Sequence, residues 1–159
     1  MSLRQPHQIH VIEDNEPDFV ALRRAIVWAL SQTDGEAEFF HHSSAEQAFD
    51  ALLQGQRPDL TFIDINLTGE SGLKFLKRVR HEPRIVPFPK IILTTSKRQS
   101  DVQEAFQQGA AGYLLKSIDS GELREAVRIS LDYWFRASLR PLHDTDGGPR
   151  WDSSYSNLD

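Results

Sequence analysis

The sequence predicts an α/β protein in which five parallel strands form one sheet with helices on both of its faces. Five short apolar segments alternate strictly with five segments whose apolar residues recur at helical spacing, and this alternation is typical of parallel sheets with right-handed connections. The helical segments begin at residues that can cap a helix, and most of them end at glycine or proline. At 159 residues the chain has the length of one domain with a substantial core.

The first two β–α units lie in the N-terminal third of the chain. An apolar strand is expected at residues 9–12, followed by two acidic residues and by a helix over residues 15–32 that Asn15 can cap. A second strand is expected at residues 38–41. The helix after it starts in a capping box at residues 43–47 and ends at a glycine.

Three further β–α units complete the pattern. Asp64 ends the first of their strands and Lys116 ends the last, while Ser100 and Asp119 are the expected N-caps of the fourth and fifth helices. The expected elements are strands at residues 60–63, 90–94 and 112–115, and helices at residues 71–82, 100–108 and 119–134. We expect the domain to occupy residues 8–138, and residues 139–159 to form a polar C-terminal tail.

The composition excludes several classes of protein. The chain has no cysteine, so it can form neither disulfides nor thiolate metal sites. No apolar run is long enough for a membrane span, and the N-terminus lacks the apolar stretch of a signal peptide. A net charge of −5 argues against a broad nucleic-acid surface. We therefore expect a soluble cytoplasmic protein that binds neither nucleic acid nor membrane.

Polar residues stand at the carboxyl ends of four of the predicted strands, at the same edge of the sheet. These residues are Glu13 and Asp14, Asp64, Thr94 and Lys116. Because the carboxyl ends of parallel strands meet at one edge, we expect a shared site there. Three crowded carboxylates raise at least one pKa unless a cation lies among them, and Mg²⁺ prefers such oxygen ligands. An ammonium and a hydroxyl nearby suit a phosphoryl group carried on a carboxylate.

With these residues in place, the chain resembles the response-regulator receiver domains of two-component signalling. The resemblance covers residues 8–138 and depends on Glu13–Asp14, Asp64 with its glycine-containing loop, Leu93–Thr94 and the segment Gly112–Lys116. It implies a flavodoxin-like, doubly wound sheet of strand order 2-1-3-4-5. It also implies a signalling protein rather than an enzyme, with at most weak autophosphatase activity.

The resemblance assigns roles to individual residues. Asp64 would be the phosphoacceptor for a sensor histidine kinase, and Asp14 would bind Mg²⁺ directly beside Asp64. Glu13 would bind the ion through water, and the backbone carbonyl of Asn66 would complete the metal site. The other implied roles are the switch hydroxyl for Thr94, the switch aromatic for Tyr113 and the phosphate counter-ion for Lys116.

Three positions depart from the family pattern. Thr68 stands where proline is frequent, Thr95 stands where a smaller residue is usual, and Ser117 stands where proline is typical. Related domains have a cis Lys–Pro bond at the last of these positions, so the Lys116–Ser117 bond is a candidate for the cis form. The Thr94–Ser96 run and the aromatic end of the last helix resemble the phytochrome-associated single-domain regulators. A bacteriophytochrome is therefore a candidate kinase, with output through binding or phosphorelay.

Two other functions compete with this interpretation. Residues 64–68 also resemble the Asp-x-Asp-x-Thr signature of haloacid-dehalogenase-type phosphatases, which form an aspartyl-phosphate. That signature should follow the first strand of its fold, whereas here it follows the third. The second alternative is a pseudo-receiver that binds partners without phosphorylation, against which the complete set of acids, threonine and lysine argues.

The sequence also indicates two features of the surface. His41 and His42 lie on a predicted edge strand, where we expect a solvated pair rather than a metal site. The aromatic run Tyr133–Phe135 spans too wide an arc to face one core, which leaves Tyr133 or Phe135 exposed near Ile129. We expect a homodimer through the fourth helix, fifth strand and fifth helix. If the C-terminal tail covers these aromatics instead, the protein is a monomer.

Overall fold

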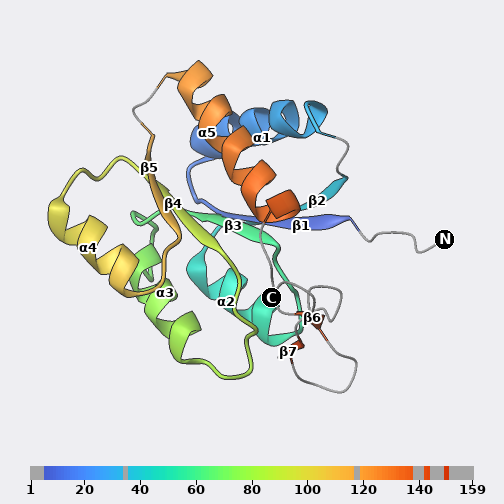
Figure 1. Ribbon diagram of the computed structural model, residues 1–159. Coiled ribbons are helices and arrows are strands. Elements are labelled where there is room, and N and C mark those ends of the chain that lie inside the picture. Colours follow the sequence, from blue (N-terminus) through green and yellow to red (C-terminus); the bar gives the residue numbers. More distant parts are fainter. Residues whose placement is uncertain (1–5, 34–35, 117–118, 138–141, 144–148, 151–159) are drawn as a thin grey trace, which may run out of the picture.

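The computed structural model describes residues 6–33, 36–116, 119–137, 142–143 and 149–150. Five parallel strands form a sheet of order β2-β1-β3-β4-β5, which confirms the predicted topology (Figure 1). The strands are β1 (His7–Ile12), β2 (Ala37–His42), β3 (Leu60–Ile63), β4 (Lys90–Thr94) and β5 (Gly112–Leu115). Two short antiparallel strands, β6 (Leu142–His143) and β7 (Pro149–Arg150), lie in the segment predicted to be a tail.

Five α-helices connect and cover the strands. They are α1 (Glu16–Ser31), α2 (Ala45–Leu53), α3 (Gly72–His81), α4 (Gln99–Gln107) and α5 (Ser120–Asp132), and a π-helical turn, η1 (Tyr133–Ala137), follows α5. Helices α1 and α5 cover one face of the sheet, and α2, α3 and α4 cover the other (Figure 1). Within the described residues, no helix is both long and apolar enough to span a membrane.

Most helix starts follow the predicted capping pattern. Asn15 caps α1 by accepting a hydrogen bond from the Asp18 N–H, and Asp119 caps α5 by accepting bonds from two backbone N–H groups. The prediction for α4 was wrong. Its N-cap is Arg98, whose side chain makes no capping bond, and Ser100 lies inside the first turn.

The two faces of the sheet have separate hydrophobic cores. Ile9 and Val11 of β1 face α1 and α5, where they pack with residues such as Ile26 and Leu131. Ile12, from the same strand, points to the opposite face and packs with α2 and α3. This alternation follows from the twofold period of a strand, and burial on both faces is typical of parallel sheets.

The register between strands brings their carboxyl ends to one level. Ile12 of β1 pairs with Ile63 of β3, and Ile63 pairs with Ile92 of β4. The residues that follow Ile12 and Ile63 therefore leave the sheet side by side. On the far side, Thr94 of β4 pairs with Leu115 of β5, so Lys116 begins at the same edge.

A row of buried polar residues crosses the face covered by α2, α3 and α4. In this buried polar row, His10 of β1 pairs with Thr61 of β3, which pairs with Lys90 of β4, and all three are at most 8% exposed. Lys90 Nζ donates to the Phe88 carbonyl at 2.8 Å. His10 Nε2 and Thr61 Oγ1 have no hydrogen-bond partner among the described residues.

The two histidines of β2 are not a solvated pair, which corrects the sequence prediction. His42 is buried, and its Nε2 lies 3.0 Å from Nδ1 of His10. His41 is exposed but stacks on Phe19 of α1, with ring centroids 3.7 Å apart. The sequence prediction failed because it took an edge strand to be solvated, whereas β2 still has one face against α1 and the other against α2.

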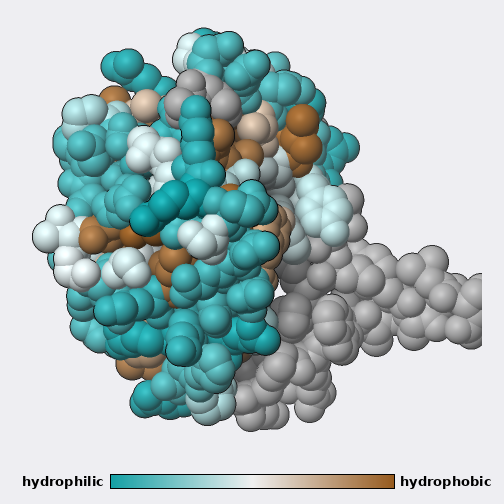
Figure 2. Space-filling model, turned by 90° about the vertical axis from the view of Figure 1, so that its left-hand side faces the viewer, coloured by the Kyte–Doolittle hydropathy of each residue, from teal (hydrophilic) through white to brown (hydrophobic). Residues whose placement is uncertain are grey.

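Several large apolar side chains on the helices are exposed. Val27 of α1 is 51% exposed and Phe106 of α4 is 50% exposed. On α5 and the turn after it, Ile129 is 55% exposed and Tyr133 is 54% exposed, while Phe135 stacks on His7. Figure 2 shows the side of the molecule on which α4 lies as mainly hydrophilic, with hydrophobic residues in small separate groups.

Candidate functional site

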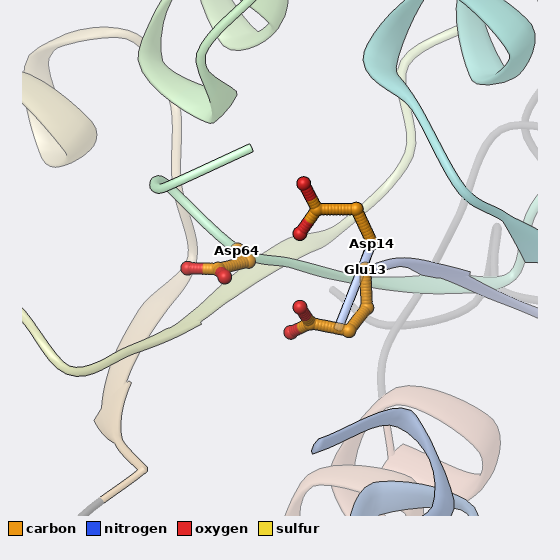
Figure 3. Close-up of side chains that lie close together, drawn as sticks. All are labelled: Glu13, Asp14 and Asp64. Atoms are coloured by element: carbon orange, nitrogen blue, oxygen red, sulfur yellow. The ribbon is translucent and has the colours of Figure 1, made fainter. Parts of the chain in front are cut away.

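Three carboxylates lie together at the carboxyl edge of the sheet. Glu13 and Asp14 follow β1, and Asp64 follows β3, so the paired register places them side by side (Figure 3). One carboxylate oxygen from each residue lies within 4.8 Å of the others. Glu13 and Asp64 are buried, whereas Asp14 is exposed, so the group opens to solvent on the side of Asp14.

The loop after β3 fixes the position of Asp64. The Asn66 N–H donates to Asp64 Oδ1 at 3.0 Å, and the Thr68 N–H donates to Asp14 Oδ2 at 2.8 Å. Gly72 begins α3 directly against this loop, because a Cβ atom there would lie 2.2 Å from the Asp64 carbonyl oxygen. The glycine therefore allows a close approach that no other residue could make without moving the backbone.

Lys116 brings a positive charge into the acidic group. Among the described residues its Nζ forms ion pairs with three carboxylates: Glu13 Oε2 at 2.6 Å, Asp18 Oδ2 at 2.8 Å and Asp64 Oδ2 at 2.9 Å. Burial lowers the pKa of Lys116, but the hydrogen bonds to Asp18, Asp64 and Glu13 together outweigh burial and raise it. The ammonium therefore stays charged at neutral pH.

The acids respond differently to this environment. Burial raises the pKa of Glu13 and outweighs its hydrogen bond to Lys116, and the nearby Asp64 adds to the rise. The backbone hydrogen bond from Thr68 lowers the pKa of Asp14. The pKa values of these two neighbouring residues are shifted in opposite directions because Glu13 points into the protein and Asp14 points to solvent.

The donor set of this group fits a hard divalent cation. Its three side chains offer only carboxylate oxygens, and a single ammonium does not balance the charge of three clustered acids. A divalent ion would relieve the repulsion that helps to raise the pKa of Glu13. The residues present therefore fit the metal site predicted from the sequence.

Thr94 and Tyr113 lie on the next two strands. Thr94 is fully buried, and its Oγ1 accepts a hydrogen bond from Asn66 Nδ2 at 3.3 Å. The Tyr113 hydroxyl donates to the Ser96 carbonyl at 2.9 Å, so the ring is tied to the loop between β4 and α4. The site thus connects to that loop through a threonine hydroxyl on one side and a tyrosine hydroxyl on the other.

The structure places Lys116 against Glu13 and Asp64, and Thr94 reaches the loop after Asp64 through Asn66. It also adds one residue to the site. Asp18, in the first turn of α1, contacts Lys116 although 98 positions separate them. The only signal in the sequence was an acidic residue one turn after the N-cap, a position where acids are common for helix stability alone. The Lys116–Ser117 bond lies outside the described residues.

The fold and the site define a receiver domain. The chain belongs to the response regulator receiver domain family, and the match to this family covers residues 9–128. The position of Asp64 after the third strand in chain order agrees with this family, and not with the phosphatase alternative.

Individual relatives include both longer regulators and proteins of similar length. The sensory transduction protein LytT of Bacillus subtilis is 32% identical over 114 residues, which cover 70% of this chain and 44% of LytT. The chain thus spans about half the length of LytT and of other curated relatives. Response regulator Rcp1 of Synechocystis sp. is 26% identical over 141 residues, which cover 86% of this chain and 94% of Rcp1.

Two solved structures resemble the chain over nearly their whole length. The Mn²⁺-bound form of Rcp1 superposes with a TM-score of 0.72 at 26% identity, covering 86% of this chain and 100% of that one. The phosphorylated cyanobacterial phytochrome response regulator RcpA gives a TM-score of 0.76 at 24% identity, covering 87% of this chain and 100% of that one. At 24% identity, the match to RcpA shows a common fold.

Proposed function

We propose that this chain is a phosphoacceptor response regulator in which Asp64 receives a phosphoryl group from the phosphohistidine of a sensor histidine kinase. A carboxylate oxygen of Asp64 attacks phosphorus while the bond between phosphorus and the histidine nitrogen breaks, which forms an acyl phosphate and restores the kinase histidine. The observation that carries the proposal is the Asp64 carboxylate, which is buried beside two acids and has the Lys116 ammonium 2.9 Å from one oxygen.

Each neighbour has a proposed role in this transfer. Lys116 compensates the negative charge of the phosphoryl oxygens, and the Thr94 hydroxyl donates to one of them. Mg²⁺, bound by Asp14 and Asp64 directly, by Glu13 through water and by the Asn66 carbonyl, would neutralise charge on the transferred group. Rcp1 has been solved in a Mn²⁺-bound form, and this divalent ion in a similar protein supports the proposed metal site.

The proposed switch begins at Thr94. If its hydroxyl turns towards a phosphoryl oxygen on Asp64, it leaves the amide of Asn66, with which it now shares a 3.3 Å hydrogen bond. The Ser96 N–H also approaches Thr94 Oγ1, at 3.4 Å, and the Ser96 carbonyl accepts from Tyr113. A movement of Thr94 therefore shifts the anchor of the Tyr113 ring, which carries the change to the surface near α4 and β5.

A small phosphodonor tests the assignment of Asp64 directly. Intact-mass measurement of the protein after treatment with the donor and Mg²⁺ should show one added phosphate, and Asp64→Asn should abolish it. Asp50→Asn, which changes an exposed acid on α2, is the matched control and should behave as wild type. Phosphate retained on Asp64→Asn would contradict the assignment of Asp64 as the phosphoacceptor. Rapid turnover of organic phosphates would favour the phosphatase. If wild type is not phosphorylated at all, the pseudo-receiver would be favoured.

The kinase partner is proposed to be of the phytochrome type. Rcp1 matches this chain over most of both lengths, and RcpA is described as a phytochrome response regulator. Phosphotransfer from each sensor kinase of the same genome, measured at short times, tests this proposal. Preferential transfer from a kinase without a phytochrome module would refute it.

A homodimer through α4, β5 and α5 is the proposed assembly. Ile129 near the end of α5 and Tyr133 at the start of η1 lie one turn apart, and both are more than half exposed. Phe106 on α4 is half exposed as well. Apolar side chains of this kind are enriched at association surfaces. Because the side of the molecule on which α4 lies is otherwise hydrophilic (Figure 2), we expect the dimer to depend on concentration.

A further inference from the structure

Asp18 is a fourth carboxylate at the site, and it lies outside the acidic group. The group of oxygens within 4.8 Å of one another comprises Glu13, Asp14 and Asp64. Asp18 instead reaches Lys116 from α1, with Oδ2 2.8 Å from Nζ, and its side chain is 42% exposed. It therefore lies between the largely buried ammonium and solvent.

The start of α1 fixes Asp18 in this position. The Asp18 N–H donates to Asn15 Oδ1 at 3.0 Å, and the Asn15 N–H donates to Glu13 Oε1 at 3.0 Å. The next residue, Phe19, stacks on His41 of β2. The helix cap thus ties Asp18 to Glu13 on one side, and the aromatic stack ties it to the sheet on the other.

The three partners of Lys116 differ in what a cation would do to them. Glu13 and Asp64 offer the same carboxylates to the Lys116 ammonium and to a metal ion, so the two cations compete for them. Asp18 is free of this competition, since it is not in the acidic group. It can keep its ion pair with Lys116 while Glu13 and Asp64 turn to the metal.

We propose that Asp18 is a positioning residue that retains Lys116 at the edge of the site when a divalent cation occupies the acidic group. Without this carboxylate, the remaining partners of the ammonium among the described residues are Glu13 and Asp64, which also belong to the metal site. The ammonium therefore opposes metal binding more strongly. Asp18 in this way makes the metal and Lys116 compatible, so that both can face a phosphoryl group on Asp64. The inference rests on the metal site of the proposed function.

Equilibrium binding of Mg²⁺ by the full chain, followed by tryptophan fluorescence or by NMR shifts, tests the role of Asp18. Asp18→Asn preserves shape but removes the charge, and it should weaken Mg²⁺ binding by about two- to fivefold, the effect of one partly exposed ion pair. Glu16→Gln removes a charge from the same turn of α1 without touching the three ion pairs of Lys116, and should change affinity less. Circular dichroism verifies folding, and Asp18→Ala serves as a second variant.

A double-mutant cycle with Lys116→Met decides whether Asp18 acts through Lys116. In the Lys116→Met background, Asp18→Asn should weaken Mg²⁺ binding no more than Glu16→Gln does. In wild type with Mg²⁺, the Lys116 ammonium should give an NMR signal protected from solvent exchange, and Asp18→Asn should lose it. If Asp18→Asn weakens Mg²⁺ binding as much in the Lys116→Met background as in wild type, or does not weaken it in wild type, this inference alone is overturned. If wild type does not bind Mg²⁺ at all, the metal site itself is overturned.

Discussion

Acid should destabilise this protein through a pair of buried histidines. His10 is 1% exposed, and its Nδ1 lies 3.0 Å from Nε2 of His42. Burial, and then repulsion from His42, lower the pKa of His10 to about 3, although Asp59 opposes the change. Burial also lowers the pKa of His42. The His10 ring is therefore neutral in the folded protein at pH 5, whereas an unfolded histidine, with a pKa of ~6.5, binds a proton there.

The sign and size of the effect follow from this difference. The unfolded state binds more protons than the folded state between its histidine pKa of ~6.5 and the folded value of about 3 for His10, so stability falls as pH falls through this window. For His10 alone, lowering the pH from 7 to 5 should reduce the free energy of unfolding by about 2 kcal/mol. His42 adds a further loss of the same sign.

Urea denaturation at pH 7 and at pH 5 measures this loss. In His10→Leu, the difference in the free energy of unfolding between pH 7 and pH 5 should be smaller than in wild type by about 2 kcal/mol. This difference is the relevant quantity, and not the stability at pH 7, because the substitution also removes the hydrogen bond between His10 and His42. Equal stability of wild type at the two pH values would refute the proposed role of the histidine pair. The same holds if the loss of stability between pH 7 and pH 5 is as large in His10→Leu as in wild type.

Three further predictions concern the site, its support and the surface. Asp14→Ala should weaken Mg²⁺ binding at least tenfold, roughly 1.4 kcal/mol, in the same titration used for Asp18; unchanged affinity would refute the metal site. Gly72→Ala should destabilise the protein by about 1–3 kcal/mol, since the new Cβ overlaps the Asp64 carbonyl, and an unchanged urea midpoint would contradict the close approach. Tyr133→Asp should leave a monomer in sedimentation experiments at concentrations where wild type associates, and a wild type that stays monomeric at tens of micromolar, with or without phosphodonor, would end the dimer proposal.

The sequence predicted those features that depend on local pattern and chain order. The alternation of apolar segments predicted a parallel sheet with helices on both faces, and the resemblance to receiver domains implied its strand order. The residues after the strands predicted the acidic group and Lys116, because parallel strands must end at one edge. Burial along α1 and α4 does not follow from apolar residue type alone. Val27 and Phe106 each directly follow a buried residue of their helix, Ile26 and Ala105. Because a step of one residue turns the side chain by about 100° around the helix axis, both point away from the core.

The missed features depend on contacts between distant segments. The ion pair of Asp18 with Lys116 joins residues 98 positions apart, and the hydrogen bond of His10 with His42 joins two strands. Neither residue type signals such a partner by itself. The missing cap of α4 has a similar cause. Ser96 and Arg98 both bond to Asp101 and fix the entry to the helix, so a capping serine at position 100 is not needed.

The buried polar row makes the two cores unequal in their resistance to local opening. The core beneath α1 and α5 is built from apolar side chains, and Asp132 Oδ1 on α5, which has no hydrogen bond there, still lies 3.6 Å from Arg136 Nη1. The opposite face contains His10 Nε2 and Thr61 Oγ1, which have no hydrogen-bond partner within the described part of the chain. Each such atom costs about 1–3 kcal/mol when dry, and a transient opening that admits water recovers that energy. Amide hydrogen exchange should therefore be faster in α2 than in α1, and the edge strand β2 should separate from the sheet before β4 does. The half of the molecule that α1 and α5 cover would then persist as the last cooperative unit to unfold.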